Sequence, residues 1–231
     1  MSKYATRLPD GRQVSLADEA AERLCCGVVV LEPVVVRENP AVWEATAILG
    51  RQMAAEFDGR LPSEIPGLAE ARSLYKSFGM DPSRHRPSSE ALLRRTLKGQ
   101  DLYHINNLVD TCNLASLQFL LPIGMYDLPL IQGNVTLRTG LDGEEYPGIR
   151  KGPVHLAGRL GLFDDAGPFG SPTSDSARTC TSDGTTSLLA VIMATGNYNR
   201  AAMAENVLVF SQLFNRYCGG QEVLRTVLGG T

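Results

Sequence analysis

Residues Ile105–Asp127 read INNLVDTCNLASLQFLLPIGMYD, and the order of features in this stretch decides the fold. An Asn-Asn turn at its start leads into an apolar run that is typical of a helix, predicted over about Asn107–Leu120. A Pro-Ile-Gly-Met-Tyr-Asp segment then ends the run. Polar Asp110 and Asn113 stand inside the run, and each has two interpretations: a structural partner for the backbone, or a group that contacts a ligand.

The sequence before this stretch predicts one strand and three helices. A run of β-branched residues over Gly27–Val36 is typical of a buried strand. The helices are predicted over Pro40–Met53 with Asn39 as the cap, over Gly67–Phe78 ended by Gly79, and over Glu90–Lys98 capped by Ser88 or Ser89 and ended by Gly99. Residues 1–23 are expected to form a polar N-terminal segment with a turn at 9–11, and residues 58–66 and 81–87 to form connecting loops.

After Asp127 the sequence predicts mainly strands. They are expected over 134–138, 154–163 and 188–194, with turns at 142–143 and 165–167. A closing helix is predicted over Arg200–Tyr217. Helices that come first and strands that come later favour an α+β fold, and a chain of 231 residues fits a single domain over 1–231.

The composition is that of an ordinary globular protein, with 43% hydrophobic and 20% charged residues. The apolar stretches are too short to span a membrane and the N-terminus lacks the apolar core of a signal peptide, so we expect a cytoplasmic protein without a membrane partner. A net charge of −3 argues against indiscriminate binding to nucleic acid, and DNA is not expected as a partner, but a local basic patch is compatible with it. Five cysteines without a CxxC pair and three scattered histidines predict reduced thiols and no metal site.

The motifs of Ile105–Asp127 resemble the B3/B4 module of the bacterial phenylalanyl-tRNA synthetase beta chain, which binds tRNA and carries the editing site of that enzyme. The module reads along the lines of INxxVDxTN, an aliphatic stretch and PLHAFD. The matching residues in this chain are Ile105, Asn106, Val109, Asp110, Asn113, Pro122, Tyr126 and Asp127. The resemblance covers residues 87–194 best, and Asp164–Thr186 parallels the second editing segment of the family.

The resemblance implies both a fold and an activity. The fold is an α+β arrangement with a sandwich-like β core flanked by helices, shared with a C-terminal domain of lysidine synthetase. The activity is trans-editing: the editing module, without the synthetase, hydrolyses mischarged aminoacyl-tRNA and has the acceptor end of the tRNA as its partner. Since an aminoacyl ester is already activated, a positioned water, hydrogen bonds to the carbonyl and the free ribose hydroxyl suffice, and we expect no metal, no cofactor and no protein nucleophile.

Two departures from the family pattern bear on the substrate. Gly124 stands where the family has a His, which reflects either backbone geometry after Pro122 or volume left for a larger amino acid. Where the family places a Glu that reads the tyrosine hydroxyl, this chain has Arg178, with Asp175 as the nearest acid. Tyrosine specificity therefore does not carry over, and we expect either a cationic arginine mimic such as canavanine, paired with Asp175, or an aromatic amino acid.

Candidate pocket residues come from the match to the family and from the Ser/Thr-rich loop before Thr186. They are Asn113, Gly124, Asp175, Arg178, Thr186, Asp110 and Asp127. The structural alternatives are a helix cap for Asp110, a turn for Asp127 and an ordinary strand residue for Thr186.

A basic helix face is the candidate RNA surface. In the predicted helix over 90–98, leucines share one side and basic residues the other, and further basic residues lie just upstream. The candidate tRNA-binding residues are Arg94, Arg95, Lys98, Arg84 and Arg86. A basic face is usually only solvated, but beside an editing pocket it suits the phosphates of an acceptor end.

Two other functions stay open at the level of the sequence. One is a module of the same fold that binds tRNA without hydrolysing it. The other is a hydrolase of a free amino-acid derivative that uses the same pocket without RNA. Salt-sensitive tRNA binding is expected of the deacylase and of the binding module, but not of the hydrolase that works without RNA. Ester hydrolysis then distinguishes the deacylase from the binding module.

Overall fold

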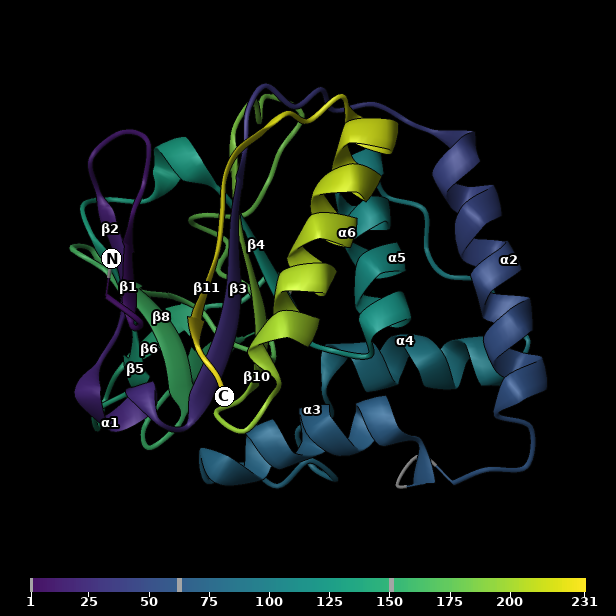
Figure 1. The fold of residues 1–231 in the computed structure, drawn as a ribbon, viewed down its shortest axis with the longest axis horizontal. Helices are drawn as coiled ribbons and strands as arrows, with labels where there is room; N and C mark the ends of the chain where they lie inside the picture. Colours follow the sequence, from purple (N-terminus) through teal and green to yellow (C-terminus); the bar gives the residue numbers. More distant parts are fainter. Residues whose placement is uncertain (1, 62–63, 150–151) are drawn as a thin grey trace.

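The computed structural model describes residues 2–61, 64–149 and 152–231 (Figure 1). Within these residues, two β-sheets face each other and helices cover the outer face of one of them. The first sheet has the strand order β1 (Ala5–Arg7), β2 (Gln13–Leu16), β5 (Val135–Thr139), β8 (Leu160–Asp164) and β9 (Gly167–Gly170). The second has the order β11 (Glu222–Gly229), β3 (Leu24–Leu31), β10 (Leu188–Thr195) and β4 (Ile123–Asp127), and a short pair is formed by β6 (Glu145–Pro147) and β7 (Pro153–His155).

Strand β3 shows how the layers are held together. It is buried along its whole length, because both of its faces are covered. Val28 and Val30 belong to the apolar core between the two sheets, which also contains Leu137 of β5. Val29 and Leu31 belong to a second core, between the four-stranded sheet and the helices. Side chains alternate between the faces of a strand, so a strand buried on both faces reads as a continuous hydrophobic run.

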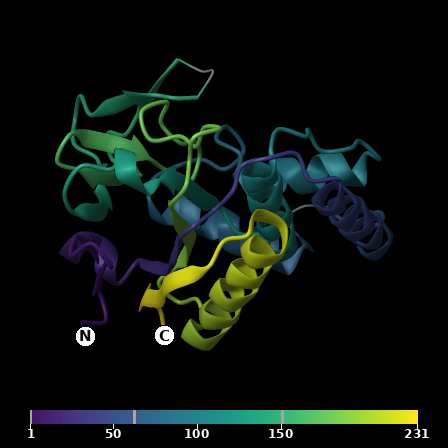
Figure 2. The same cartoon turned by 90° about the horizontal axis from the view of Figure 1, so that it is seen from above.

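The helices form a layer and an extension. Helices α5 (Asn107–Phe119) and α6 (Arg200–Cys218) pack side by side on the four-stranded sheet, and α2 (Pro40–Glu56) lies beyond them, far from the five-stranded sheet (Figures 1 and 2). Helix α4 (Ser88–Leu97) contacts α2 and α5, while α3 (Pro66–Ser77) packs against β10. Short helical segments are α1 (Asp18–Ala21) and the 3-10 helix η2 (Leu128–Leu130). The candidate site lies where α4 and α5 meet β4, the edge strand of the four-stranded sheet.

The α+β class and the sandwich-like core flanked by helices are confirmed. The five predicted helices are α2, α3, α4, α5 and α6. Asn39 caps α2 as predicted, since its side chain accepts a hydrogen bond from the Ala41 amide at 3.1 Å. The predicted cap of α4 at Ser88 or Ser89 is wrong, because the helix already begins at Ser88 and Pro87 occupies the cap position without a side-chain hydrogen bond.

Two predicted strands have different bounds in the structure. The strand predicted over 27–36 is β3, and it ends before Pro33, which has no amide hydrogen to donate to a strand ladder. The strand predicted over 154–163 is divided into β7 and β8. Between them the Arg159 amide donates to the Leu156 carbonyl, and Gly158 has a positive φ of 69°, so the chain turns there instead of continuing.

Other elements lie outside what the sequence predicted. The polar segment 1–23 contains the β1–β2 hairpin with its turn at 9–11, and strands β4 and β11 were not predicted. The loop predicted over 58–66 includes residues 62–63, which lie outside the described residues. None of the helices in the described part of the chain combines the length and the hydropathy that a membrane crossing requires.

Candidate functional site

Two asparagines fix the N-terminal end of α5. The side-chain oxygen of Asn106 accepts a hydrogen bond from the Val109 amide at 3.0 Å and thereby caps the helix. Asn107 is fully buried, and its side-chain amide donates to the carbonyls of Val35 and Tyr217 at 2.8 and 3.1 Å. These bonds tie α5 to the segment after β3 and to the end of α6, so the helix presents a defined face to the site.

A cavity of about 520 Å³, here called the large cavity, lies between α5, β4 and the loop of residues 171–181. Val109, Ile123 and Met125 give it apolar walls. Polar groups reach it from α5, with Asn113, and from the loop, with Asp175. A mainly apolar hollow with a few polar groups is the usual form of a site for a small molecule.

Asn113 lies at the meeting point of several hollows. It is half-buried, and it lines the large cavity as well as two grooves beside α4. No described residue forms a hydrogen bond with its side-chain amide, so both donors and the oxygen are available to a ligand. Asn113 therefore lies in the lining of the large cavity, and its role in a substrate pocket stays a prediction.

Asp175 faces the large cavity from the loop side. Burial raises the pKa of its carboxyl from 3.8 to about 7, so its charge changes near neutral pH. Burial, and after it the nearby Asp175 charge, raises the pKa of the Cys112 thiol in the same cavity far above its usual range, and a protonated thiol does not suit a nucleophile. In the described part of the chain, no three His, Cys, Asp or Glu side chains lie close enough to hold a metal ion together.

Gly124 does not open the large cavity. A Cβ atom at Gly124 would lie 2.2 Å from the Tyr126 hydroxyl oxygen, and one at Gly170 would lie at the same distance from it. The buried Tyr126, which packs edge-to-face on Phe169 at 4.9 Å between ring centres, therefore fills the space that the glycine leaves. The expectation of volume for a larger amino acid is wrong, and so is the backbone explanation, since Gly124 does not have a positive φ.

Asp110 and Asp127 have structural partners. The Asp110 carboxylate accepts hydrogen bonds from the Trp43 indole at 2.7 Å and from the Ile105 amide at 3.0 Å. Asp127 is buried and accepts a hydrogen bond from the Thr185 hydroxyl at 2.6 Å, which closes the loop before β10. Both carboxylates are thus held by the protein, and Asp127 lies outside the lining of the large cavity.

Arg178 and Thr186 also lie outside the lining of the large cavity, contrary to the expectation from the family. The Arg178 side chain points away from the cavity, and its guanidinium forms two hydrogen bonds with the Asp164 carboxylate, at 2.8 and 2.9 Å. Thr186 is exposed, and its carbonyl accepts a hydrogen bond from the Val34 amide at 2.9 Å. Of the acidic and basic residues in this loop, Asp175 is the one that the structure brings to Asn113.

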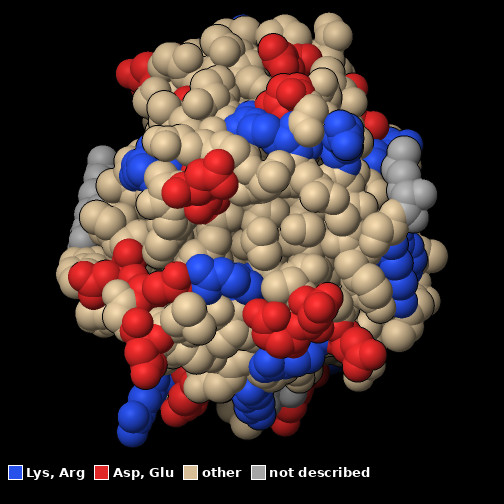
Figure 3. Space-filling model, turned by 90° about the vertical axis from the view of Figure 1, so that its left-hand side faces the viewer, with Lys and Arg blue, Asp and Glu red and all other residues tan. Residues whose placement is uncertain are grey.

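Two more open grooves beside α4 adjoin the large cavity. Both share Leu92 and Asn113 with it. The basic residues predicted to contact tRNA line these grooves: Arg84, Arg86, Arg94, Arg95 and Lys98. On the molecular face shown in Figure 3, by contrast, Lys and Arg are interspersed with Asp and Glu.

A buried carboxylate organises part of this basic surface. Glu90 of α4 is 1% exposed, and it accepts hydrogen bonds from Arg94 Nε at 2.8 Å and from Arg72 Nη1 at 3.2 Å. Arg86 Nε lies 3.9 Å from the same carboxylate. A buried charge is stable only when it is paired, so Glu90 and its arginines hold one another in place. Their positive charge is partly balanced, which leaves Arg95 and Lys98 as the freer cations of the grooves.

The sequence reasoning missed the apolar wall of the large cavity. Ile123 and Met125 of β4 line the cavity, while Tyr126 on the same strand belongs to the core between the sheets. Because alternate residues of a strand face opposite sides, the period of two in IGMYD was the signal that could have separated the two sets.

The fold is thus an α+β sandwich in which a cavity adjoins the basic residues beside α4. The B3/4 domain family matches residues 70–217, more than half of the chain, and the protein belongs to this family. Among solved structures, the chain is similar to an N-terminal fragment of the phenylalanyl-tRNA synthetase beta-subunit from Pyrococcus horikoshii, with 11% identity and a TM-score of 0.45. The match covers 93% of this chain and 53% of that fragment, so the chain spans about half of the fragment's length. No curated protein matches the sequence.

Proposed function

We propose that this protein is an aminoacyl-tRNA deacylase that removes wrong amino acids from tRNA in trans. One observation carries the proposal: at Asn113 and Leu92 the large cavity adjoins two grooves lined by five basic side chains. The cavity suits an amino-acid side chain and the grooves suit phosphates. An aminoacyl-tRNA is a substrate that carries both, and the editing activity implied by the B3/B4 resemblance agrees with this arrangement.

The groups at the junction suit ester hydrolysis. The free amide of Asn113 can donate to the ester carbonyl and stabilise the negative charge that develops there when water attacks. The carbon–oxygen bond to the ribose then breaks, and the proton of the water goes to the ribose oxygen, with the neighbouring ribose hydroxyl as a relay. The chemistry needs no protein nucleophile, which agrees with the raised pKa of Cys112.

The chemistry of Asp175 favours a cationic amino acid over an aromatic one as the substrate. An ionised carboxylate in a cavity with apolar walls gains most from a side chain that carries a guanidinium-like or ammonium group at the end of an apolar stem. An arginine mimic such as canavanine has this form. We therefore propose it as the substrate class, with Asp175 as the recognising residue.

Removing Arg95 and Lys98 is expected to weaken tRNA binding and to flatten its dependence on salt. Arg95 lies with its guanidinium 4.1 Å from the centre of the exposed Tyr103 ring, and Lys98 is exposed on the same groove. Each lost phosphate contact lowers the log–log salt slope by roughly 0.7–0.9, so Arg95→Ala/Lys98→Ala should lower it by about 1.5. Filter binding at several salt concentrations measures both quantities.

The matched control removes two cations elsewhere. Arg7→Ala/Lys76→Ala takes the same charge from exposed residues of β1 and α3 and should leave the slope near the wild-type value. Equal slopes for the two double variants would show that the α4 face is only solvated and makes no phosphate contacts.

A panel of tRNAs charged with wrong amino acids tests the proposed function. The purified protein should release the amino acid from at least one of them, and most readily from a tRNA that carries a cationic arginine mimic. Binding of tRNA without release of amino acid would show a non-catalytic binding module. Hydrolysis of free amino-acid esters as fast as charged tRNA would show a hydrolase of free amino-acid derivatives.

A further inference from the structure

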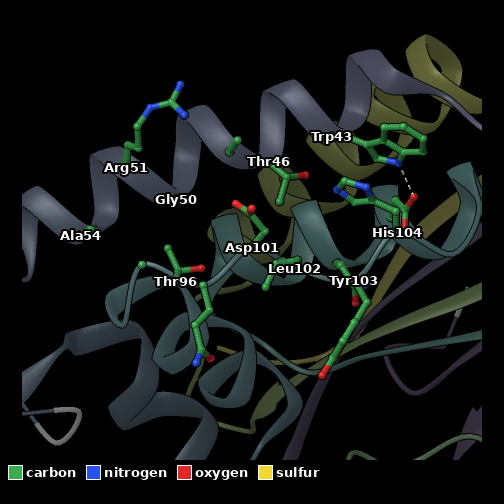
Figure 4. Close-up of a pocket in the computed structure, with 15 residues that line it drawn as sticks. Trp43, Thr46, Gly50, Arg51, Ala54, Thr96, Asp101, Leu102, Tyr103 and His104 are labelled. Carbon is green, nitrogen blue, oxygen red and sulfur yellow. Dashed lines mark hydrogen bonds between the residues drawn. The ribbon is translucent and has the colours of Figure 1, made fainter.

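A second, smaller cavity of about 170 Å³ lies between α2 and the segment of residues 99–104 (Figure 4). Trp43, Thr46 and Gly50 line it from α2, and Asp101 and His104 line it from the segment. It adjoins the basic groove of α4, with which it shares residues of the same segment. None of the basic residues predicted to bind tRNA lines this cavity.

An aromatic stack bounds the small cavity at one end. The rings of Trp43 and His104 lie parallel, with 4.3 Å between their centres and an interplanar angle of 1°. The Trp43 indole donates to Asp110, which also holds the Ile105 amide, so the stack is fixed in orientation from both sides (Figure 4). His104 is exposed, and next to it Tyr103 is 69% exposed. Exposed flat rings beside a basic groove are the usual platform for unpaired nucleobases.

A carboxylate gives the small cavity a preference among bases. Asp101 points from the segment toward α2 (Figure 4), and no described residue donates a hydrogen bond to its carboxylate. A carboxylate accepts hydrogen bonds from the amino group of cytosine, and equally from the amino groups of adenine and guanine. Uracil has no amino group, and its one edge donor, N3–H, stands between two carbonyl oxygens that repel a carboxylate, so it is the disfavoured base.

The two cavities meet at Asn113, which lines both. In an aminoacyl-tRNA the ester joins the amino acid to the ribose of the unpaired terminal nucleotide. A terminal base in the small cavity and an amino acid in the large cavity would therefore bring the ester to Asn113.

We propose that the small cavity binds the unpaired 3′-terminal nucleotides of the substrate RNA, with a base stacked at the Trp43–His104 pair and its amino group on Asp101. This inference rests on the proposed deacylase function and deepens it, since it assigns the RNA end to a site of its own. It also makes the grooves of α4 the path of the phosphates that lead to that end.

Trp43 is the only tryptophan of the chain, so its fluorescence reports directly on this site. Two uncharged tRNA transcripts with the same body are titrated, one ending in CCA and one ending in UUU. The CCA transcript is expected to change Trp43 fluorescence and to bind more tightly than the UUU transcript. His104→Ala should weaken binding of the CCA transcript roughly 5- to 100-fold, as expected for one lost stacking contact.

Asp101→Asn distinguishes recognition from simple stacking. The amide keeps the shape of the carboxylate but can donate to uracil oxygens, so the preference for CCA over UUU should shrink or reverse. His155→Ala, an exposed histidine of β7, is the matched control and should change nothing. Equal binding of the two transcripts, or wild-type binding by His104→Ala, overturns the assignment even if the protein deacylates tRNA. Absence of both tRNA binding and deacylation overturns the proposed function itself.

Discussion

The Gly124→Ala variant is expected to be less stable than the wild-type protein by roughly 2–3 kcal/mol of unfolding free energy. The added methyl group would lie 2.2 Å from the Tyr126 hydroxyl oxygen and 2.7 Å from the ring carbon Cζ. The ring has no room to move aside, because the Gly170 backbone lies so close that a Cβ atom there would also be 2.2 Å from the hydroxyl oxygen, and Phe169 packs on the ring. Urea denaturation measures the change.

Tyr126→Phe tests this cause. The Tyr126 hydroxyl is buried beside Asp175 but forms no hydrogen bond of normal geometry with a described residue, so its removal alone should change stability little. In the Gly124→Ala variant, Tyr126→Phe should recover part of the unfolding free energy that Gly124→Ala loses. Gly184→Ala is the control, since the nearest atom to its added methyl lies at 3.8 Å. If Gly124→Ala unfolds at the same urea concentration as Gly184→Ala, the packing explanation of Gly124 is wrong.

The Asp175→Asn variant is expected to lose roughly 10- to 100-fold in kcat/KM for a tRNA that carries a cationic amino acid, the loss of one charge-assisted hydrogen bond. The loss for a neutral amino acid should be much smaller. Only the ionised carboxylate pairs with a cation, and the pKa of Asp175 is about 7. Wild-type kcat/KM for the cationic substrate should therefore rise with pH through neutrality, and the variant should lack this rise.

Stability provides an independent readout of Asp175. In the folded protein, Asp175 keeps its proton up to about pH 7. In the unfolded chain, Asp175 loses the proton near its ordinary pKa of 3.8. Wild-type stability therefore falls as pH rises between these values, and Asp175→Asn should be the more stable protein at pH 8, by roughly 2–4 kcal/mol. Asp183→Asn, an exposed acid of the same region, is the matched control. Equal losses for cationic and neutral substrates would exclude Asp175 as the recognising residue.

The sequence predicted those parts of the fold that depend on local pattern. Helix α5 follows from an apolar run that begins after an Asn-Asn turn, and in the structure the side chain of Asn106 from that turn caps the helix. Strand β4 was missed because its alternation extends over only five residues after Pro122, which is too short a stretch to indicate a strand by itself. Its pairing with β10, from Ile123 opposite Ile192 to Asp127 opposite Leu188, depends on contacts between residues far apart in the chain.

The residues of the candidate site could be predicted where they lie on a helix. They could not be predicted where the path of a loop determines the direction of the side chain. Asn113 and the basic residues of α4 lie on helices, so their directions follow from helical geometry. Arg178 lies three residues after Asp175, yet it pairs with Asp164 on another strand, and no local rule specifies that turn. The expectation of extra pocket volume at Gly124 failed for a similar reason. The Tyr126 ring fills that space, and it is held there by Phe169 and Gly170 from a distant part of the chain.

Release of amino acid from mischarged tRNA is the most direct test of the proposal that the large cavity and the α4 grooves form a deacylase site. The measurement is the rate at which labelled amino acid is lost from each member of a panel of misacylated tRNAs, with the purified protein and without ATP. The predicted result is a loss proportional to protein concentration for at least one member, fastest for a cationic arginine mimic and strongly reduced in Asp175→Asn. If every member of the panel keeps its amino acid as long with the protein as without it, the proposed function is contradicted.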